Sequence, residues 1–382
     1  MVIQHKCINC GADMVFDPDS GMILCQSCGS VFSIEEMENE LNRYNPEDIP
    51  ESFQEPEAET DFDADIDETD QLEYENDDFK YYTEADNMEV TNYQCRNCGA
   101  RLVAGRNVTS TKCSFCDSPM VIGERLVGEL QPSYVIPFKI SKEEAKKVFE
   151  KWRKKAVFAP NAFKKSARIK ELAGQYVPFW LYDVTSSGEY EGTGVVVRRY
   201  YSGDYIITER KIFNVYRKFN LNMKRIPADA SKKMKDEIMD KLEPFYCGDL
   251  KEFNTPYLAG YLAEKYDYTD KDLFPRVKER VQKYTRDFLK STVDRYSSFS
   301  NTRFTAVVRP DKTDYVLMPV WLFVCRYNEV DYMFTMNAQT GKVIGKAPIS
   351  KAKVAFSFTS FTLLFTFLLR LLAFIMGGDF LW

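Results

Sequence analysis

Four pairs of cysteines, each spaced C-x-x-C, are the residues of this sequence whose type and spacing could do chemistry. They form two sets with 14 residues between the pairs of each set: Cys7, Cys10, Cys25 and Cys28, then Cys95, Cys98, Cys113 and Cys116. This spacing is close to that of four-cysteine zinc ribbons. Because Zn²⁺ favours a tetrahedron of such ligands, the sequence predicts two zinc ribbons with one Zn²⁺ each. Iron in a rubredoxin-like redox site takes the same four thiolates and is the less favoured alternative.

Glycine follows the second cysteine in three of the four pairs, as Gly11, Gly29 and Gly99. A zinc knuckle needs an open backbone at this position, so that an N–H group can approach a sulfur. The fourth pair is followed by Asp117 instead, and its geometry is the one that the sequence leaves open. The single histidine, His5, lies outside the first pair, and we expect it to be exposed to solvent.

The ligand sets favour a structural role over catalysis. Four cysteines leave no open position on the metal for a water molecule. The chain has no G-x-x-x-x-G-K-[ST] loop and no G-x-G-x-x-G opening a helix after a strand, and a single histidine makes Ser-His or Cys-His catalysis implausible. We therefore expect a protein that is not an enzyme.

Charge is distributed unevenly along the chain. Residues 47–89 hold 19 acidic residues against one base, Lys80, so the net charge of −6 conceals a basic remainder. Such a segment repels itself and has little to bury, which predicts a disordered acidic linker. The N-terminus shows no apolar signal segment, so we expect reduced thiols in the cytoplasm.

After the second ribbon the pattern is that of a packed α+β domain. Three helices are predicted: one after a capping box of Ser141 and Glu144, one at 231–242, and one at 274–296 with Val277, Val281, Tyr284 and Phe288 on its inner face. The apolar face of the first helix is Ala145, Val148, Phe149, Trp152 and Ala156.

Strands are predicted between these helices, at 176–184, 194–201, 205–219, 304–308, 317–327, 332–337 and 342–346. The related motifs at 178–182 and 319–323 suggest two related halves. A hairpin turn at 337–342 places Gly341 where a positive φ is needed.

The C-terminal residues predict a membrane anchor, and the alternatives are a helix in the plane of the membrane or a buried apolar helix. Residues 354–376 carry one charge, Arg370, and as a helix they extend about 34 Å, enough to cross a bilayer. Lys346, Lys351 and Lys353 precede them, which favours a cytoplasmic location for the bulk of the chain. A threonine stripe that continues to Arg370 favours a helix–helix contact and hence a homo-oligomer, and the alternative is that each hydroxyl bonds to its own helix. The stripe consists of Thr359, Thr362 and Thr366.

Nucleic acid is the main alternative partner. Residues 139–170 hold twelve bases against three acids, with aromatic residues among them. Since those aromatic residues lie on the predicted inner face of a helix, the bases are more simply its solvated face. Near a membrane the same face is equally suited to contact anionic lipid.

Four phrases of the sequence resemble a family of bacterial, largely Firmicute, TFIIB-type zinc-ribbon membrane proteins, which are often labelled replication-restart helicases or primosomal proteins. The phrases lie at 176–183, 255–267, 318–327 and 334–351. The resemblance implies a cytoplasmic, membrane-tethered partner of PspA-type envelope-stress proteins and SPFH-type scaffolds. The helicase label finds no support in the residues, because a nucleotide-binding loop is missing.

Together these patterns predict a multidomain chain. Its parts are zinc ribbon 1 (1–34), an acidic disordered linker (35–92), zinc ribbon 2 (93–123), an α+β domain with antiparallel sheets (124–350), and a C-terminal membrane anchor (351–382) with one transmembrane helix. The predicted function is that of a membrane-tethered zinc-ribbon adaptor or scaffold, with a nucleic-acid-binding zinc-ribbon protein as the alternative.

Overall fold

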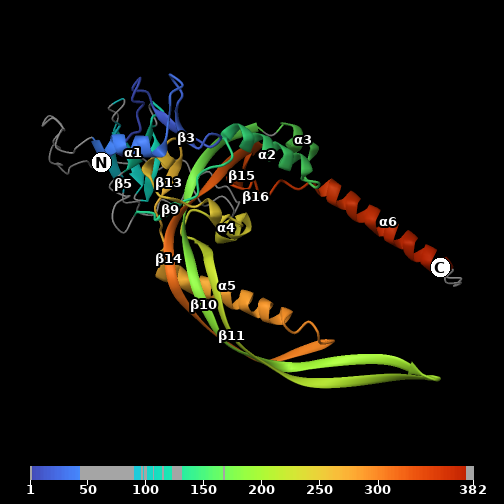
Figure 1. Ribbon diagram of the computed structural model, residues 1–382. Coiled ribbons are helices and arrows are strands. Elements are labelled where there is room, and N and C mark those ends of the chain that lie inside the picture. The colour runs from blue at the N-terminus through green and yellow to red at the C-terminus, as the bar shows by residue number, and fades with distance from the viewer. Residues whose placement is uncertain are drawn as a thin grey trace, which may run out of the picture. The chain divides into compact units, whose positions relative to one another are not determined.

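Figure 1 shows a computed structural model of the chain, which describes residues 2–43, 90–95, 98, 101–105, 107–113, 116–122, 131–166 and 168–375. The described residues belong to two compact units. The first unit spans 1–17, 22–127 and 254–260, and the second spans 18–21, 128–253 and 261–382. Residues 44–89, which make up most of the predicted acidic linker, lie outside the described part.

Both cysteine sets lie in the first unit, here called the ribbon unit. Its first half is a three-stranded antiparallel sheet, β2-β3-β4, followed by helix α1. The bounds are β1 (Val2–Ile3), β2 (Met14–Asp17), β3 (Met22–Cys25), β4 (Val31–Phe32) and α1 (Ile34–Arg43). Helix α1 corrects the predicted linker, which began at residue 35. The missed signal was a capping box, in which the Glu36 N–H donates to Ser33 Oγ and the Ser33 N–H donates to Glu36 Oε2.

The second half of the ribbon unit consists of two antiparallel strand pairs, β5-β6 and β7-β8. The bounds are β5 (Val90–Gln94), β6 (Arg101–Gly105), β7 (Val108–Lys112) and β8 (Pro119–Ile122). Strand β1 pairs with β8, so that Val2 lies opposite Ile122. The Ser118 hydroxyl also donates a hydrogen bond to Asp13. The two ribbons, predicted as separate domains, therefore form one unit.

A segment from far along the sequence completes the ribbon unit. This segment, 254–260, contains the 3₁₀ turn η7 (Thr255–Leu258). The Phe16 N–H donates to the Ala259 carbonyl at 3.0 Å, and the Ser110 hydroxyl donates to the Leu258 carbonyl at 3.4 Å. The Phe16 and Tyr257 rings lie 5.4 Å apart. The segment thus contacts both ribbons, which gives part of the phrase at 255–267 a structural role.

The second unit is built on a mainly antiparallel sheet in the order β11-β10-β14-β15-β16, which confirms the predicted antiparallel architecture (Figure 1). Short strands β13 and β9 run parallel to β10 and β14, and β12 pairs with β9. The strand bounds are β9 (Tyr134–Val135), β10 (Arg168–Ser202), β11 (Tyr205–Asp229), β12 (Lys251–Glu252), β13 (Leu262–Glu264), β14 (Ser298–Tyr327), β15 (Val330–Asn337) and β16 (Val343–Gly345).

Strands β10 and β14 are much longer than predicted, because each joins two predicted strands. Gly188 and Gly192 resemble turn signals in the sequence, but they lie inside β10 opposite β14. A Cβ atom at Gly188 would lie 1.9 Å from the Thr305 carbonyl oxygen, so glycine here permits close strand approach. The two related motifs at 178–182 and 319–323 lie on these adjacent strands of one sheet.

Beyond the pairing of Val195 with Ser298, strand β10 pairs only with β11 among the described residues, and the two project as a hairpin (Figure 1). Its tip is a two-residue turn with Gly203 at a φ of 63°. The side chains around the tip are exposed and apolar or aromatic: Tyr200, Tyr201, Tyr205, Ile206 and Ile207.

Helices cover both faces of this sheet. They are α2 (Lys142–Lys155), α3 (Asn161–Ser166), α4 (Asp236–Leu242) and α5 (Asp270–Ser291), and a 3₁₀ turn, η6 (Cys247–Asp249), follows α4. Phe149 of α2 stacks on Phe323 of β14 with ring centroids 4.5 Å apart. Helix α4 packs on Val177, Phe179 and Leu181, and α5 packs on Tyr182 and Val184, which face the other way.

Three details of the predicted helices are wrong. Ser141 is the N-cap of α2, but its side chain makes no capping hydrogen bond. Helix α4 begins at Asp236 rather than 231, because Asp229 and Ser231 accept local backbone N–H groups. Helix α5 begins at 270 after a capping box of Thr269 and Asp272, and Tyr284 and Phe288 are exposed. Its buried line is Leu273, Val277, Val281, Thr285 and Leu289.

The C-terminal helix, α6 (Lys351–Ile375), includes a candidate membrane span, Lys351–Leu372, with a mean hydropathy of 1.7. No part of its most apolar window is buried against the described residues. A helix of this length extends about 33 Å, which matches a bilayer core. The hydroxyls of Thr359, Thr362 and Thr366 donate to carbonyls of their own helix. Each hydroxyl therefore has a hydrogen-bond acceptor within α6, which agrees with the alternative interpretation that the threonines bond to their own helix rather than to a second one.

Asp229 should make the stability of the second unit depend on pH. Its side chain is 1% exposed, and this burial raises its pKa from 3.8 to about 8. The hydrogen bond from the Ser231 N–H acts in the opposite direction and lowers the pKa. Nearby Asp236 raises the pKa further and Arg276 lowers it. Since the folded state binds this proton more tightly than the unfolded chain, the contribution to stability is complete below about pH 4 and is lost as the pH rises toward 8.

Asp229→Asn is accordingly expected to gain stability relative to wild type by up to about 1.4 kcal/mol per pH unit across this window. Denaturant unfolding of both chains at several pH values measures the difference. A difference that stays constant between pH 4 and 8 contradicts the assignment.

Candidate metal centres

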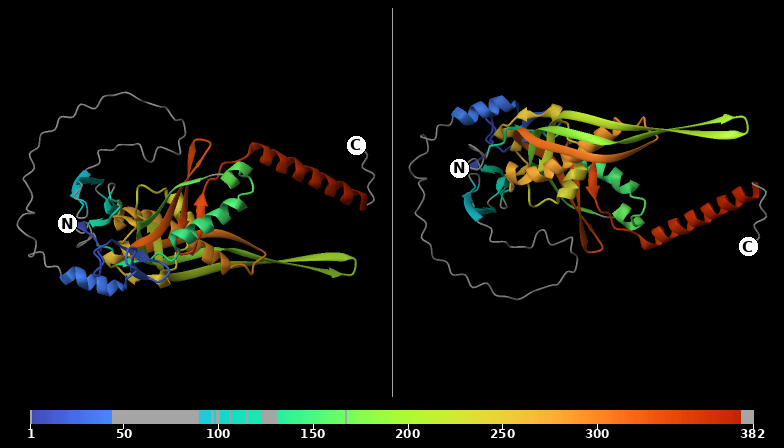
Figure 2. Two further views of the ribbon diagram at one scale, coloured as in Figure 1. Left: turned by 90° about the horizontal axis from the view of Figure 1, so that it is seen from above. Right: turned by 90° about the horizontal axis from the view of Figure 1, so that it is seen from below.

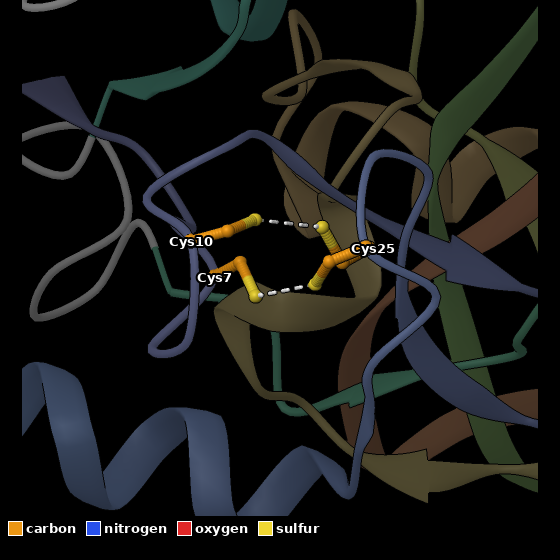
Figure 3. Close-up of side chains that lie close together, drawn as sticks. Cys7, Cys10 and Cys25 are labelled. Atoms are coloured by element: carbon orange, nitrogen blue, oxygen red, sulfur yellow. Dashed lines mark hydrogen bonds between the residues drawn. The ribbon is translucent and has the colours of Figure 1, made fainter.

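The four sulfurs of the first set converge on a single point. The Sγ atoms of Cys7 and Cys28 lie 3.6 Å apart, and those of Cys10 and Cys25 lie 3.5 Å apart. Figure 3 shows the labelled side chains pointing toward one another from two loops. The hairpin of β2 and β3 brings these loops together, because Cys10 precedes β2 and Cys25 ends β3.

The second set has the same geometry. The Sγ atoms of Cys95 and Cys116 and those of Cys98 and Cys113 lie 3.7 Å apart in both pairs. In each set all four sulfurs lie within 4.8 Å of one another. The structure therefore brings together all eight predicted ligands, in the two predicted groups.

These distances fit a tetrahedral metal better than disulfides. A regular tetrahedron with metal–sulfur bonds of about 2.3 Å has edges of about 3.8 Å. A disulfide would bring two sulfurs to about 2.05 Å. The observed separations of 3.5–3.7 Å are close to the first value. The two groups therefore suit Zn²⁺, and the same geometry admits iron.

Among the described residues, the loops that begin at Cys7, Cys25 and Cys113 share one backbone pattern. The N–H of the first cysteine donates to the carbonyl five residues later, and the N–H four residues later donates back to that cysteine's carbonyl. The first bond runs from Cys7 to Ala12, from Cys25 to Ser30 and from Cys113 to Ser118, at 2.8 to 2.9 Å. This turn carries both cysteines on one side, which positions their sulfurs for a common metal.

The turn requires a left-handed residue, and the structure settles the open question about the fourth pair. Gly11 and Gly29 have φ values of 71° and 76°, and Asp117 adopts the same conformation at 56°. Aspartate is one of the few residues other than glycine that tolerate this region. Gly99 lies outside the described residues.

Local hydrogen bonds already favour a thiolate in the first set. The Ser30 hydroxyl lies 3.1 Å from Cys28 Sγ and, with the Ser30 backbone, lowers the pKa of that thiol to about 6. The Ala12 backbone lowers the pKa of Cys10, but the neighbouring sulfurs, with that of Cys28 foremost, outweigh it and raise this pKa to about 12. Four thiolates therefore need a cation among them. The spacing of the cysteines does not reveal the contribution of Ser30.

His5 corrects another expectation. It was predicted to be exposed, but only 3% of it is exposed. Burial lowers its pKa to about 4, although a hydrogen bond with the Thr255 backbone raises the pKa. The 254–260 segment that covers it lies 250 residues away in sequence, so no local pattern could have shown this. His5 belongs to neither group of ligand atoms.

The glycine positions of the loops predict how substitutions affect metal retention. A Cβ at Gly29 would meet no atom within 4 Å, so only the backbone conformation penalises a side chain there. We expect Gly29→Val to speed zinc release, since a left-handed L-residue costs about 1–2 kcal/mol. Gly29→Asn should have a smaller effect, and Asp117→Gly should slow release. A colorimetric chelator competition on the full chain measures all three, and equal rates for Gly29→Val and Gly29→Asn would contradict this account.

Comparison with known proteins found one protein with a similar sequence. No family model matches the chain, and no solved structure matches it. It is 40% identical over 382 residues to "Uncharacterized protein YdjG" of Bacillus subtilis (strain 168), and the alignment covers 100% of both chains. An identity of this size over the full length of both chains shows common descent, so this chain belongs to the family of the Bacillus subtilis protein YdjG.

Proposed function

We propose that this protein is a non-enzymatic adaptor, tethered to the cell membrane by α6, that binds protein partners through its ribbon unit. The observation that carries the proposal is the pair of closed four-cysteine groups, which leave a metal no open position for a substrate or water. Such metals stabilise a small fold and shape its surface. The proposed ligands of Zn²⁺ are the eight cysteines, and iron is the less favoured occupant.

Exposed apolar side chains lie on the first cysteine loop and directly after the second. Ile8, between Cys7 and Cys10, is 50% exposed, and Val31, just after the second loop, is 47% exposed. Aliphatic residues that a metal-bound loop holds in place offer a rigid contact surface at little entropic cost. They are the first residues to test as a partner contact.

The partners and the orientation belong to the same proposal. Lys346, just before α6, and Lys351 and Lys353, in its first turn, favour a cytoplasmic ribbon unit. The resemblance to TFIIB-type zinc-ribbon membrane proteins favours PspA-type or SPFH-type membrane proteins as partners. A homo-oligomer through α6 is proposed as well, and crosslinking in native membranes tests it.

Nucleic acid remains the alternative partner, and the structure weakens one argument for it. Phe149 is fully buried, and the Trp152 ring lies 5.2 Å from that of Phe334. These rings serve the core beneath α2 and are not a stacking platform for bases. Binding of DNA or RNA by the full chain that falls steeply with salt would favour the alternative.

Affinity purification of the full chain from membranes tests the adaptor proposal. The test variant is Ile8→Ser with Val31→Ser, which changes the loop surface and leaves every cysteine in place. The control is Val307→Ser, since Val307 is 53% exposed in β14 of the second unit. We expect the test variant to keep its zinc and to lose partners at least about tenfold, because central contacts cost 1–2 kcal/mol each. Equal recovery from both variants contradicts binding through the ribbon unit.

A second control tests whether partners bind the second unit instead of the ribbon unit. Tyr201→Ser with Ile206→Ser changes the exposed tip of the β10–β11 hairpin, where these side chains are 80% and 63% exposed. If only this variant loses partners, the partner docks on the second unit and the proposed binding surface is wrong.

A further inference from the structure

The membrane helix is attached to the turn between α2 and α3, residues 156–160. The Ser350 N–H donates to the Phe158 carbonyl at 2.8 Å. The Lys353 ammonium donates to the Ala159 carbonyl and to Asn161 Oδ1, both at 2.7 Å. Figures 1 and 2 show α6 leaving the second unit beside α3. Wherever α6 enters a bilayer, this turn lies next to the entry point.

Apolar side chains are exposed at this junction. Val157 is 71% exposed and Phe158 is 46% exposed, and Phe356 in the first turns of α6 is 76% exposed. Together with Ala352 these residues line a shallow depression against the start of the helix. Their position continues the apolar surface of α6 onto the second unit.

The surrounding charge is of one sign. Residues 151–166 contain six basic residues and no acidic one, and residues 346–354 add three lysines and no acid. The side chains of Lys154, Lys155 and Lys165 are exposed. Among the described residues no carboxylate forms an ion pair with these three lysines.

We propose that the α2–α3 turn lies on the bilayer surface, with Val157 and Phe158 among the lipid headgroups and with Lys154, Lys155 and Lys165 against the phosphates of anionic lipids. This inference rests on the proposed membrane anchor. Apolar residues at the acyl boundary with lysines around them match the pattern of interfacial lipid contacts. The attraction of lysine to an anionic surface acts within about 8 Å at physiological salt, and these lysines flank the turn that is hydrogen-bonded to the start of α6. The basic face of α2 thereby gains a partner other than nucleic acid.

Photocrosslinking of the full chain tests this inference. A photoreactive benzoylphenylalanine replaces Val157 in one preparation and Val307, 53% exposed in β14, in the control. Each chain is reconstituted in vesicles of phosphatidylcholine alone or with phosphatidylglycerol, and lipid adducts are measured by mass spectrometry. We expect adducts at 157 at least about fivefold above those at 307, enriched in phosphatidylglycerol.

The charge contribution is tested by Lys154→Gln, Lys155→Gln and Lys165→Gln together. We expect the phosphatidylglycerol share of the adducts at 157 to fall at least about tenfold, since each lysine contributes a factor of about five. Zinc content and membrane integration should stay unchanged. Adducts at 157 that equal those at 307, show no lipid preference, or join nucleic acid or a second copy of the chain overturn the inference. Carbonate extraction of the same vesicles separates this failure from a failure of the anchor, which would release the whole chain.

Discussion

Replacing Cys25 and Cys28 with serine is expected to lower the zinc content of the full chain from two ions to one and to unfold much of the ribbon unit. Structural zinc supplies about 10–16 kcal/mol of apparent binding free energy in small ribbon-like folds. The ligands are themselves part of the small core: around the second site, the buried cluster among the described residues consists of Cys95, Cys113 and Met120. Zinc analysis and hydrogen exchange over the ribbon unit measure both effects.

The joined ribbons extend this prediction to the second site. Strand β1 lies four residues before Cys7 and pairs with β8, and Asp13 accepts the Ser118 hydrogen bond. Loss of the first metal should therefore speed zinc release from the second set. Cys325→Ala, which removes a buried cysteine of β14 outside both sets, should keep both ions. Full zinc content in the Cys25/Cys28 variant, or release from the second set at the wild-type rate, would show that the sites are absent or independent.

Lysine at both Leu363 and Leu364 is expected to move the chain from the membrane fraction to the soluble fraction. Both side chains are exposed near the middle of the candidate span. A charged residue at the centre of a membrane helix costs about 2.5–3.5 kcal/mol, so the pair costs about 5–7 kcal/mol of insertion free energy. Carbonate extraction followed by immunodetection measures the distribution.

Thr359→Leu with Thr362→Leu is the matched control for the anchor. The two hydroxyls bond to carbonyls of their own helix, so their removal leaves no buried group without a partner. This variant should stay in the membrane fraction. A chain with both lysines that still resists carbonate extraction would show that α6 does not hold the protein in the membrane as a single span.

The local features of the metal centres could be predicted from the sequence because their causes are local. The spacing of the cysteines determines which sulfurs meet, and glycine after the second cysteine indicates the left-handed residue of the loop. Asp117 shows the limit of this reasoning. Its type differs from glycine, yet its φ of 56° gives the same loop, because the hydrogen bonds of Cys113 fix the backbone there.

The features that could not be predicted depend on distant residues. His5 is buried by a segment near residue 255, and the pairing of β1 with β8 brings together Val2 and Ile122, which are 120 residues apart in sequence. Glycine is typical of turns, but Gly188 lies inside a long strand, where the absence of a side chain lets β10 and β14 approach closely. On α5 both Tyr284 and Thr285 continue the line from Val281 at helical spacing. Packing on the sheet, where the Thr285 hydroxyl donates to Ser186 Oγ at 3.0 Å, decides between them.

We propose above all that two closed four-thiolate zinc sites organise the ribbon unit of a membrane-tethered adaptor. X-ray absorption at the zinc edge, with metal analysis of the purified full chain, tests it most directly. We predict two zinc ions per chain, each with four sulfur neighbours at about 2.3 Å and no oxygen or nitrogen ligand. A red preparation that contains iron, or a zinc ion with an oxygen ligand in place of a sulfur, would contradict the claim and reopen redox or catalytic chemistry at these cysteines.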